Sequence, residues 1–360
     1  AYQNALPESA FAQAFRNRQD IRGADTNSTQ VFYDRSLSMS YQMASLEYAA
    51  KMYQLRDQIN EHVQDVNRSD EARLLATELN SHIQSLVRPE VAGWSKALTS
   101  AAFGWTLGFN VSSALVNMSQ VPLVVMPYLG GKYGYGKTSA ALGNATKLLI
   151  KEEITAAQSL DNYDFDAKGT SKEVKRLKEL SALSVKYGLL DRSMTNDLLE
   201  SGPKSDVLDN VNKYSGFIFH HGERMNRQVA LIASYNLELG RMAKERKIDI
   251  DALTPANREA AAEEAVRLAE LLNGGASAGS APLLAKNSIG KVMFMYKRYG
   301  ASMYYMMFKT AKEAMKSESP EVRNAAMRQI LGIYVSAGAM AGVQGLPMMG
   351  MAMMIANMFR

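Results

Sequence analysis

The sequence contains one stretch whose residue types and spacing match a known chemical motif. Residues 131–138 read GKYGYGKT and fit the pattern G-x-x-x-x-G-K-[ST] without a mismatch. In a nucleotide hydrolase this loop joins a strand to a helix, and its backbone N–H groups hold the phosphates. The pattern would assign phosphate binding to Gly131, Gly136, Lys137 and Thr138.

The residues around this motif do not supply the rest of a nucleotide site. The strand entering the loop would have to be VPLVVM (121–126), which contains one proline and is followed by another. Hydrolysis also needs a carboxylate at the end of a second apolar strand, and the nearest candidate, KIDIDA (247–252), has too little apolar length. We therefore expect a glycine hinge after an apolar helix, with Lys132 and Lys137 marking where solvent begins.

A second group of polar residues, HHGER at 220–224, has the types needed for metal or acid–base chemistry. His220 and Glu223 could share one helix face, but no third ligand lies at a useful spacing. His221 falls on an apolar stripe, where a hydrogen-bonded core histidine is the usual outcome, and Glu223 is spaced for a salt bridge with Arg227. The chain has four scattered histidines and no cysteine, so we expect no metal site. Because neither polar group forms a convincing catalytic constellation, we also expect no catalytic residue, no cofactor and no enzyme.

Apolar residues recur at three- and four-residue spacings almost throughout the chain, which is typical of amphipathic helices. No alternating polar and apolar segment is longer than four residues. The sequence therefore predicts an all-α fold, an elongated multi-helix array. The expected helices cover residues 38–66, 70–87, 138–159, 170–188, 207–246, 255–272 and 287–316, and a last helix begins near 320.

Local start and stop signals divide this array. Thr170 and Glu173 have the spacing of a capping box, and Thr254 precedes a proline at the first helical position. We expect five segments: an N-terminal helical segment (1–94), an apolar helical hairpin with a glycine hinge (95–160), a central helical domain (161–272), a flexible linker (273–282) and Met/Tyr-rich C-terminal helices (283–360).

Two long stretches, 97–131 and 329–359, contain no charged residue. Each is long enough to cross a bilayer, although both contain prolines and polar side chains. We expect two long uncharged helical stretches that contact either a membrane or other protein surfaces, within the chain or in an oligomer. The residues predicted to make these contacts are Trp105, Tyr128, Gly338, Gly342, Met349 and Met353.

Residues 291–309 (KVMFMYKRYGASMYYMMFK) combine cations with aromatic and Met side chains. Such a segment could lie at a lipid interface, contact DNA, or pack against neighbouring helices. For the first two alternatives, the residues expected to meet headgroups or phosphates are Lys291, Lys297, Arg298 and Lys309. The net charge of +5 is compatible with an anionic partner, and the 22 methionines suit surfaces that repack against changing partners.

Three segments occur in an order that resembles one group of proteins. These are residues 110–142, residues 222–239, and residues 281–300 after the Gly/Ser-rich linker. Together they resemble the C-terminal parts of the internal virion (ejection) proteins of short-tailed bacteriophages and the related large polyvalent proteins of phages. The resemblance covers roughly residues 95–320 and rests on order and spacing. Because the chain starts at Ala1 and stops directly after an apolar run, we expect it to be part of a longer polypeptide.

The resemblance implies a structural protein that is packaged in the capsid with the genome and leaves through the tail. It would then form a homo-oligomeric conduit for phage DNA in the host cell envelope. Its implied partners are other internal virion proteins, phage DNA bound without sequence specificity, and the host membrane. Some members carry a lytic transglycosylase or a virion RNA polymerase, and this sequence shows the signature of neither. The alternatives are a DNA-binding accessory region of a virion RNA polymerase polyprotein and, less favoured, a nucleotide hydrolase.

Overall fold

The computed structural model contains only helices among the residues it describes, which confirms the all-α prediction. The described residues are 28–64, 70–87, 93–106, 117–151, 163–166, 171–186, 217–273, 283, 287–293, 298–342, 346 and 349. The expected linker at 273–282 lies outside them except for Asn273. The chain forms two compact units, residues 1–90 and 91–360. The finer segment boundaries stay predictions.

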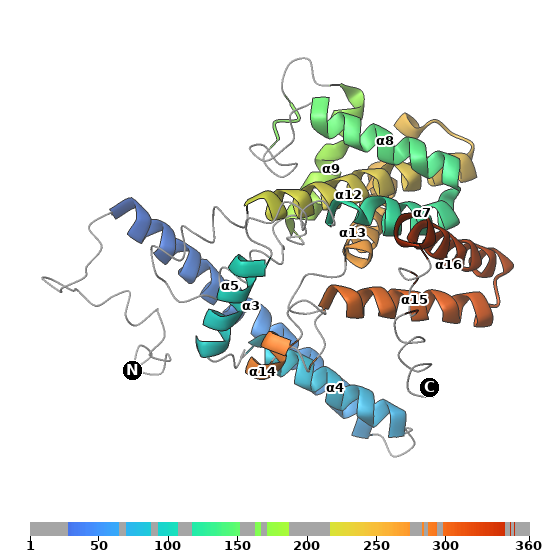
Figure 1. Cartoon of the computed structure of the whole chain (residues 1–360). Helices are drawn as coiled ribbons and strands as arrows, with labels where there is room; N and C mark the ends of the chain where they lie inside the picture. Colours follow the sequence, from blue (N-terminus) through green and yellow to red (C-terminus); the bar gives the residue numbers. More distant parts are fainter. Residues whose placement is uncertain are drawn as a thin grey trace, which may run out of the picture. The chain divides into compact units, whose positions relative to one another are not determined.

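The first unit contains a pair of packed helices, α3 (Ser28–Gln64) and α4 (Asp70–Val87) (Figure 1). The side-chain amide of Asn80 donates a 2.9 Å hydrogen bond to the side-chain oxygen of Asn60, which joins them. Ala76 and Ile83 of α4 are buried. Met43 and Leu55 of α3, although apolar and within the helix expected at 38–66, are 65% and 56% exposed.

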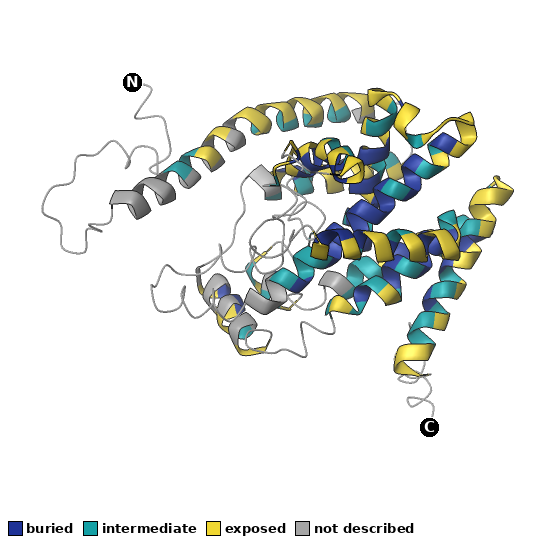
Figure 2. Ribbon diagram, turned by 90° about the horizontal axis from the view of Figure 1, so that it is seen from above, coloured by how far each residue is buried: buried dark blue, intermediate teal, exposed yellow. Residues whose placement is uncertain are grey.

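The second unit is built around α12 (Phe217–Arg246) and α13 (Pro255–Leu272), which a short 3₁₀ turn at Ile250–Ala252 connects. Helices α8 (Tyr135–Lys151) and α9 (Lys172–Lys186) pack against this pair. Figure 2 shows the buried residues gathered where these helices meet. The largest fully buried side chains are Leu129, Leu149, Leu177, Leu180, Leu231, Ile232, Tyr235, Leu239 and Leu268.

A π-helical turn and a helix break shape the segment before α8. The π turn, Val121–Val125, leads directly into α7 (Met126–Tyr133). The backbone N–H of Met126 donates to the carbonyl of Val121, one residue farther back than in an α-helix. Prolines at 122 and 127 lack an N–H, and a wider turn accommodates their rings. Gly134 then separates α7 from α8 with a φ of 97°, which a residue with a side chain rarely adopts.

The C-terminal helices cover α7. Helix α16 (Pro320–Ala341) packs on α7, and α15 (Arg298–Lys316) packs on α16 (Figure 1). The predicted helix at 287–316 is described in two pieces, α14 (Ser288–Met293) and α15, with residues 294–297 outside the described set. Helix α14 packs against α5 (Gly93–Thr106).

Helix starts follow the expected chemistry with one correction. The side chain of Thr254 accepts a hydrogen bond from the backbone N–H of Asn257, as predicted, and Ser319 accepts one from Val322 before the last helix. Thr170, from which the capping box was predicted, lies outside the described residues. Ser171 accepts the bond from the N–H of Val174 at 3.3 Å. Since α9 begins at Lys172, Glu173 lies too early in the helix to complete the box.

The expectation of two long uncharged helical stretches is wrong. In the first, residues 107–116 lie outside the described set, and a π turn interrupts the helix before α7. The second ends early, because α16 stops at Ala341 and Gly342 takes a φ of 65°. Within the described ranges, no helix combines the length and the apolar content needed to span a bilayer.

Glycine at 131 is predicted to be essential for the contact between α7 and α16. A Cβ added there would meet the backbone N and Cα of Gln329 at 2.7 and 2.9 Å. We expect Gly131→Ala to lower the free energy of unfolding by about 1–3 kcal/mol, measured by urea denaturation. Gly143→Ala on α8 is the control, because its Cβ would meet nothing within 4 Å. That substitution should stabilise by roughly 0.5–1 kcal/mol, and equal effects at both glycines would contradict the close contact.

Candidate functional site

Two residues of the glycine-rich motif, Lys132 and Tyr133, belong to a cluster of charged and aromatic side chains. We call the group Lys132, Tyr133, Glu238, Arg241, Glu264 and Arg267 the α7 clamp. In its first half, Lys132 on α7 donates to Glu264 on α13 at 2.7 Å. Arg267, one turn farther along α13, holds the same carboxylate with two bonds of 2.6 and 2.7 Å. Burial alone would raise the pKa of Glu264, but the bonds from Arg267 and Lys132 outweigh it and lower that pKa to about 2.

The second half of the α7 clamp joins α7 to α12. The hydroxyl of Tyr133 donates to Glu238 at 2.7 Å, and the Arg241 guanidinium binds the same carboxylate. The Glu238 side chain is only 4% exposed. Burial acts to raise its pKa, yet the bonds from Arg241 and Tyr133 keep it below the usual value. Burial and the neighbouring Glu238 carboxylate raise the pKa of Tyr133, so this hydroxyl stays protonated as a donor.

Helix α16 holds the same segment from its other side. The side-chain amide of Gln329 donates to the carbonyl of Tyr128 at 3.1 Å, inside the protein. The hydroxyl of Tyr135 donates to the carbonyl of Arg328 at 2.8 Å. The Tyr135 ring also occupies the space in which Cβ atoms at Gly130 and Gly332 would lie. Gly130, Gly131 and Gly332 therefore allow α7, α16 and the Tyr135 side chain to approach closely.

The geometry of the motif differs from that of a phosphate loop. Gly131 lies within α7 and Gly136 within α8, and the segment before them is helical. Lys137 is exposed and Thr138 is buried. The predicted glycine break is present at Gly134. Lys132 is half-buried and is paired with Glu264, and residues 134–137 after it are exposed.

The second polar group, HHGER at 220–224, contributes an ion pair within α12. Arg227 and Glu223 form the predicted ion pair at 3.3 Å, with the Arg227 side chain only 4% exposed. His221 is half-buried, and burial lowers its pKa. Across the part of the chain that the structure describes, no cluster of three or more His, Asp or Glu side chains is placed to hold a metal ion.

The residues predicted for membrane or helix contacts do not form one surface. Tyr128 is buried and packs within the chain, whereas Trp105 on α5 is 90% exposed. A Cβ at Gly338 would meet the Leu346 side chain at 3.4 Å. Gly342 is exposed and ends α16, where its N–H donates to the carbonyl of Gly338. Met349 is half-buried, and Met353 lies outside the described residues. The close helix contact is made by Gly131 and Gly332 instead. The sequence analysis could have found it from the four-residue spacing of the small residues Gly332 and Ser336.

The predicted cations are spread over two helices. Lys291 belongs to α14, Arg298 is the first residue of α15, and Lys297 lies outside the described residues. Lys309 is exposed on α15, together with Lys312 and Lys316. The prediction missed the last two, although their spacing from Lys309 places all three on one side of a helix.

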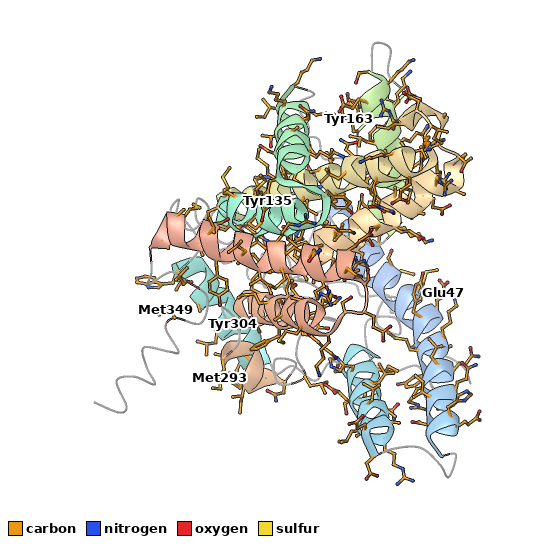
Figure 3. The ribbon with its side chains drawn as sticks, turned by 90° about the vertical axis from the view of Figure 1, so that its right-hand side faces the viewer. Glu47, Tyr135, Tyr163, Met293, Tyr304 and Met349 are labelled. Atoms are coloured by element: carbon orange, nitrogen blue, oxygen red, sulfur yellow. The ribbon has the colours of Figure 1, made fainter. Side chains whose placement is uncertain are left out.

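The side chains exposed on α15 and α16 form the candidate functional surfaces. On α16, Met327, Leu331 and Val335 are 59%, 65% and 62% exposed. On α15, Tyr304, Tyr305, Phe308 and Met315 are exposed. Figure 3 shows Tyr304 and Tyr135 on opposite sides of α16. Comparison with protein families, with curated proteins and with solved structures finds no match to this chain.

The α7 clamp should make stability depend on acid pH through Glu264. Its folded-state pKa of about 2 lies below the ordinary value of 4.5, so its contribution is present above about pH 4.5 and is lost as the pH falls towards 2. We expect Glu264→Gln to cost about 2 kcal/mol of unfolding free energy at pH 7, and the difference from the wild type to shrink below pH 4.5. Urea denaturation at a series of pH values measures this. Glu263→Gln, on the same helix and exposed, is the control, and a Glu264→Gln effect that is independent of pH would exclude the ionic role.

Proposed function

We propose that this chain is a structural ejection protein of a bacteriophage virion, which forms homo-oligomers and helps to build a conduit for DNA across the host envelope. The observation that carries the proposal is the outer face of α16. Met327, Leu331 and Val335 follow one another at four-residue spacings, so they form one row along the helix. Beyond Arg328 this helix has no charged residue. A row of exposed aliphatic side chains is typical of a surface that another protein covers.

The row is held rigidly by the opposite face of α16. Ala326, Gln329 and Ile333 are buried, and Gln329 is bonded to the backbone of α7. Rotating the helix to hide Leu331 would expose Ile333 and break the bond from Gln329. The apolar row is therefore a stable feature of the folded chain, which a second copy can cover without a change of fold.

The resemblance of residues 95–320 to ejection proteins supports the assignment of this assembly to a phage particle. A chain without cysteine can pass through a tail without reducing disulfides. The interrupted helices at the π turn and at Gly134 provide joints at which the chain can extend. A head-to-tail contact through the α16 row would close into a ring if the rotation between copies permits it.

The oligomer is tested by placing charge in the α16 row. We expect the purified chain to form oligomers in size-exclusion chromatography with light scattering, and rings in electron micrographs. Leu331→Lys together with Val335→Lys should weaken association by about two orders of magnitude, since both side chains would become buried charges. Ile150→Lys with Val185→Lys is the matched control, because these residues are 61% and 53% exposed on α8 and α9.

Two results would reject the proposal. A wild-type chain that remains a monomer over a wide concentration range would exclude assembly through any surface. An oligomer that survives the Leu331 and Val335 substitutions unchanged would exclude the α16 row as its contact. Circular dichroism of each variant checks that the helices are retained.

A further inference from the structure

Helix α15 has two faces of different chemistry. Its inner face contributes Met306, Thr310 and Ala314, which are 1%, 2% and 7% exposed. On its outer face, Tyr304, Phe308 and Met315 are 43%, 60% and 74% exposed. Spacings of four and seven residues place these three side chains in one row along the helix. The packing of the inner face therefore fixes the direction in which the row points.

Lysines border this row on one side. Lys309, Lys312 and Lys316 are all exposed, and their spacings of three and four residues place them along one flank of the helix. Tyr305, which is 66% exposed, lies on the same flank. The single acidic residue of α15, Glu313, is half-buried and lies close enough to Tyr128 of α7 to influence its pKa. The outer face of α15 thus has only positive charges, and the nearest exposed acid, Glu318, comes after the helix ends.

We propose that this outer face of α15 is a docking surface for an anionic lipid membrane, with the helix lying in the plane of the interface. Phe308 and Met315 would enter the boundary between headgroups and acyl chains, and Tyr304 would lie at headgroup level. The three lysines would bind the lipid phosphates beside them. The inference rests on the proposed function, which brings the protein to the host envelope, and it states the chemistry of that contact.

The distribution of the side chains favours a membrane over nucleic acid. Duplex DNA offers phosphates to lysines, but its backbone has no apolar region to cover Phe308 and Met315. Single-stranded DNA can stack bases on Tyr304 and Phe308, but Met315, the most exposed of the row, has no ring for stacking. A membrane surface satisfies both groups at once, because its phosphates and its apolar layer lie side by side at the same interface.

Flotation with lipid vesicles tests the inference on the complete chain. We expect binding to vesicles of phosphatidylcholine with 30% phosphatidylglycerol, and weak binding to phosphatidylcholine alone. The variant Lys309→Gln/Lys312→Gln/Lys316→Gln should bind the anionic vesicles roughly a hundredfold more weakly, at about fivefold for each lysine. The matched control is Lys147→Gln/Lys151→Gln/Lys172→Gln, which removes the same charge from exposed positions on α8 and α9.

A second variant tests the apolar row. Phe308→Ser with Met315→Ser keeps every charge, so it should weaken binding to anionic vesicles at high salt, where the lysines are screened. Since the chain has no cysteine, Phe308→Cys can also carry a single environment-sensitive dye. Its emission should shift to the blue on vesicle binding, whereas a dye at Glu263→Cys on α13 should not respond.

Three outcomes would overturn the inference. They are equal loss of binding in both lysine variants, no response of the dye at position 308, and lysine-dependent binding of single-stranded DNA without vesicle binding. None of these depends on light scattering, so rings that form without vesicle binding would reject the lipid surface and leave the proposed oligomer standing. Vesicle binding by a chain that stays monomeric would reject the proposed oligomer and leave the lipid surface standing.

Discussion

The placement of two carboxylates, the buried Glu238 and the half-buried Glu264, constrains the rest of the second unit. Glu238 and Glu264 lie on neighbouring helices, and each needs a positive partner because a buried charge without one is costly. Arg241 and Arg267 supply part of the compensation from the same helices. The remainder comes from α7, through Lys132 and Tyr133. The rotation of α7 about its own axis is therefore set by charge compensation.

That rotation determines what α7 presents to its other neighbour. With Lys132 and Tyr133 turned towards α12 and α13, Gly131 faces α16 and lets the backbone of Gln329 approach. Gln329 then bonds to the carbonyl of Tyr128, and Tyr135 bonds to the carbonyl of Arg328 from the far side of the break. The α7 clamp and the α16 contact are two consequences of one arrangement. This packing explains Gly131, the first glycine of the phosphate-like motif, whereas a Cβ at Gly136 would meet nothing within 4 Å.

The same arrangement produces two exposed surfaces of different character. Because α16 is fixed against α7, its aliphatic row of Met327, Leu331 and Val335 faces outward. Because α15 packs on α16 and buries Met306 and Ala314 on its inner face, its aromatic row and its lysines also face outward. A row of exposed aliphatic side chains suits contact with protein, whereas a row of rings beside lysines suits a phosphate-bearing interface. The two surfaces can therefore serve assembly and membrane contact separately.

Local features of the sequence determined the fold class and several helix boundaries. The helical period predicted α4 at Asp70–Val87 and α13 ending at Leu272, and the Thr254 cap and the ion pair of Glu223 and Arg227 follow from short-range spacing. Tertiary structure alone decided the partners of the glycine-rich segment. Lys132 pairs with a residue 132 positions away, and Tyr135 and Tyr128 bond to residues 193 and 201 positions away. Periodicity tells which side chains share a face, but it does not tell what that face meets. For this reason Tyr128 became a core residue, Met43 remained exposed, and a motif typical of phosphate binding became a helix contact.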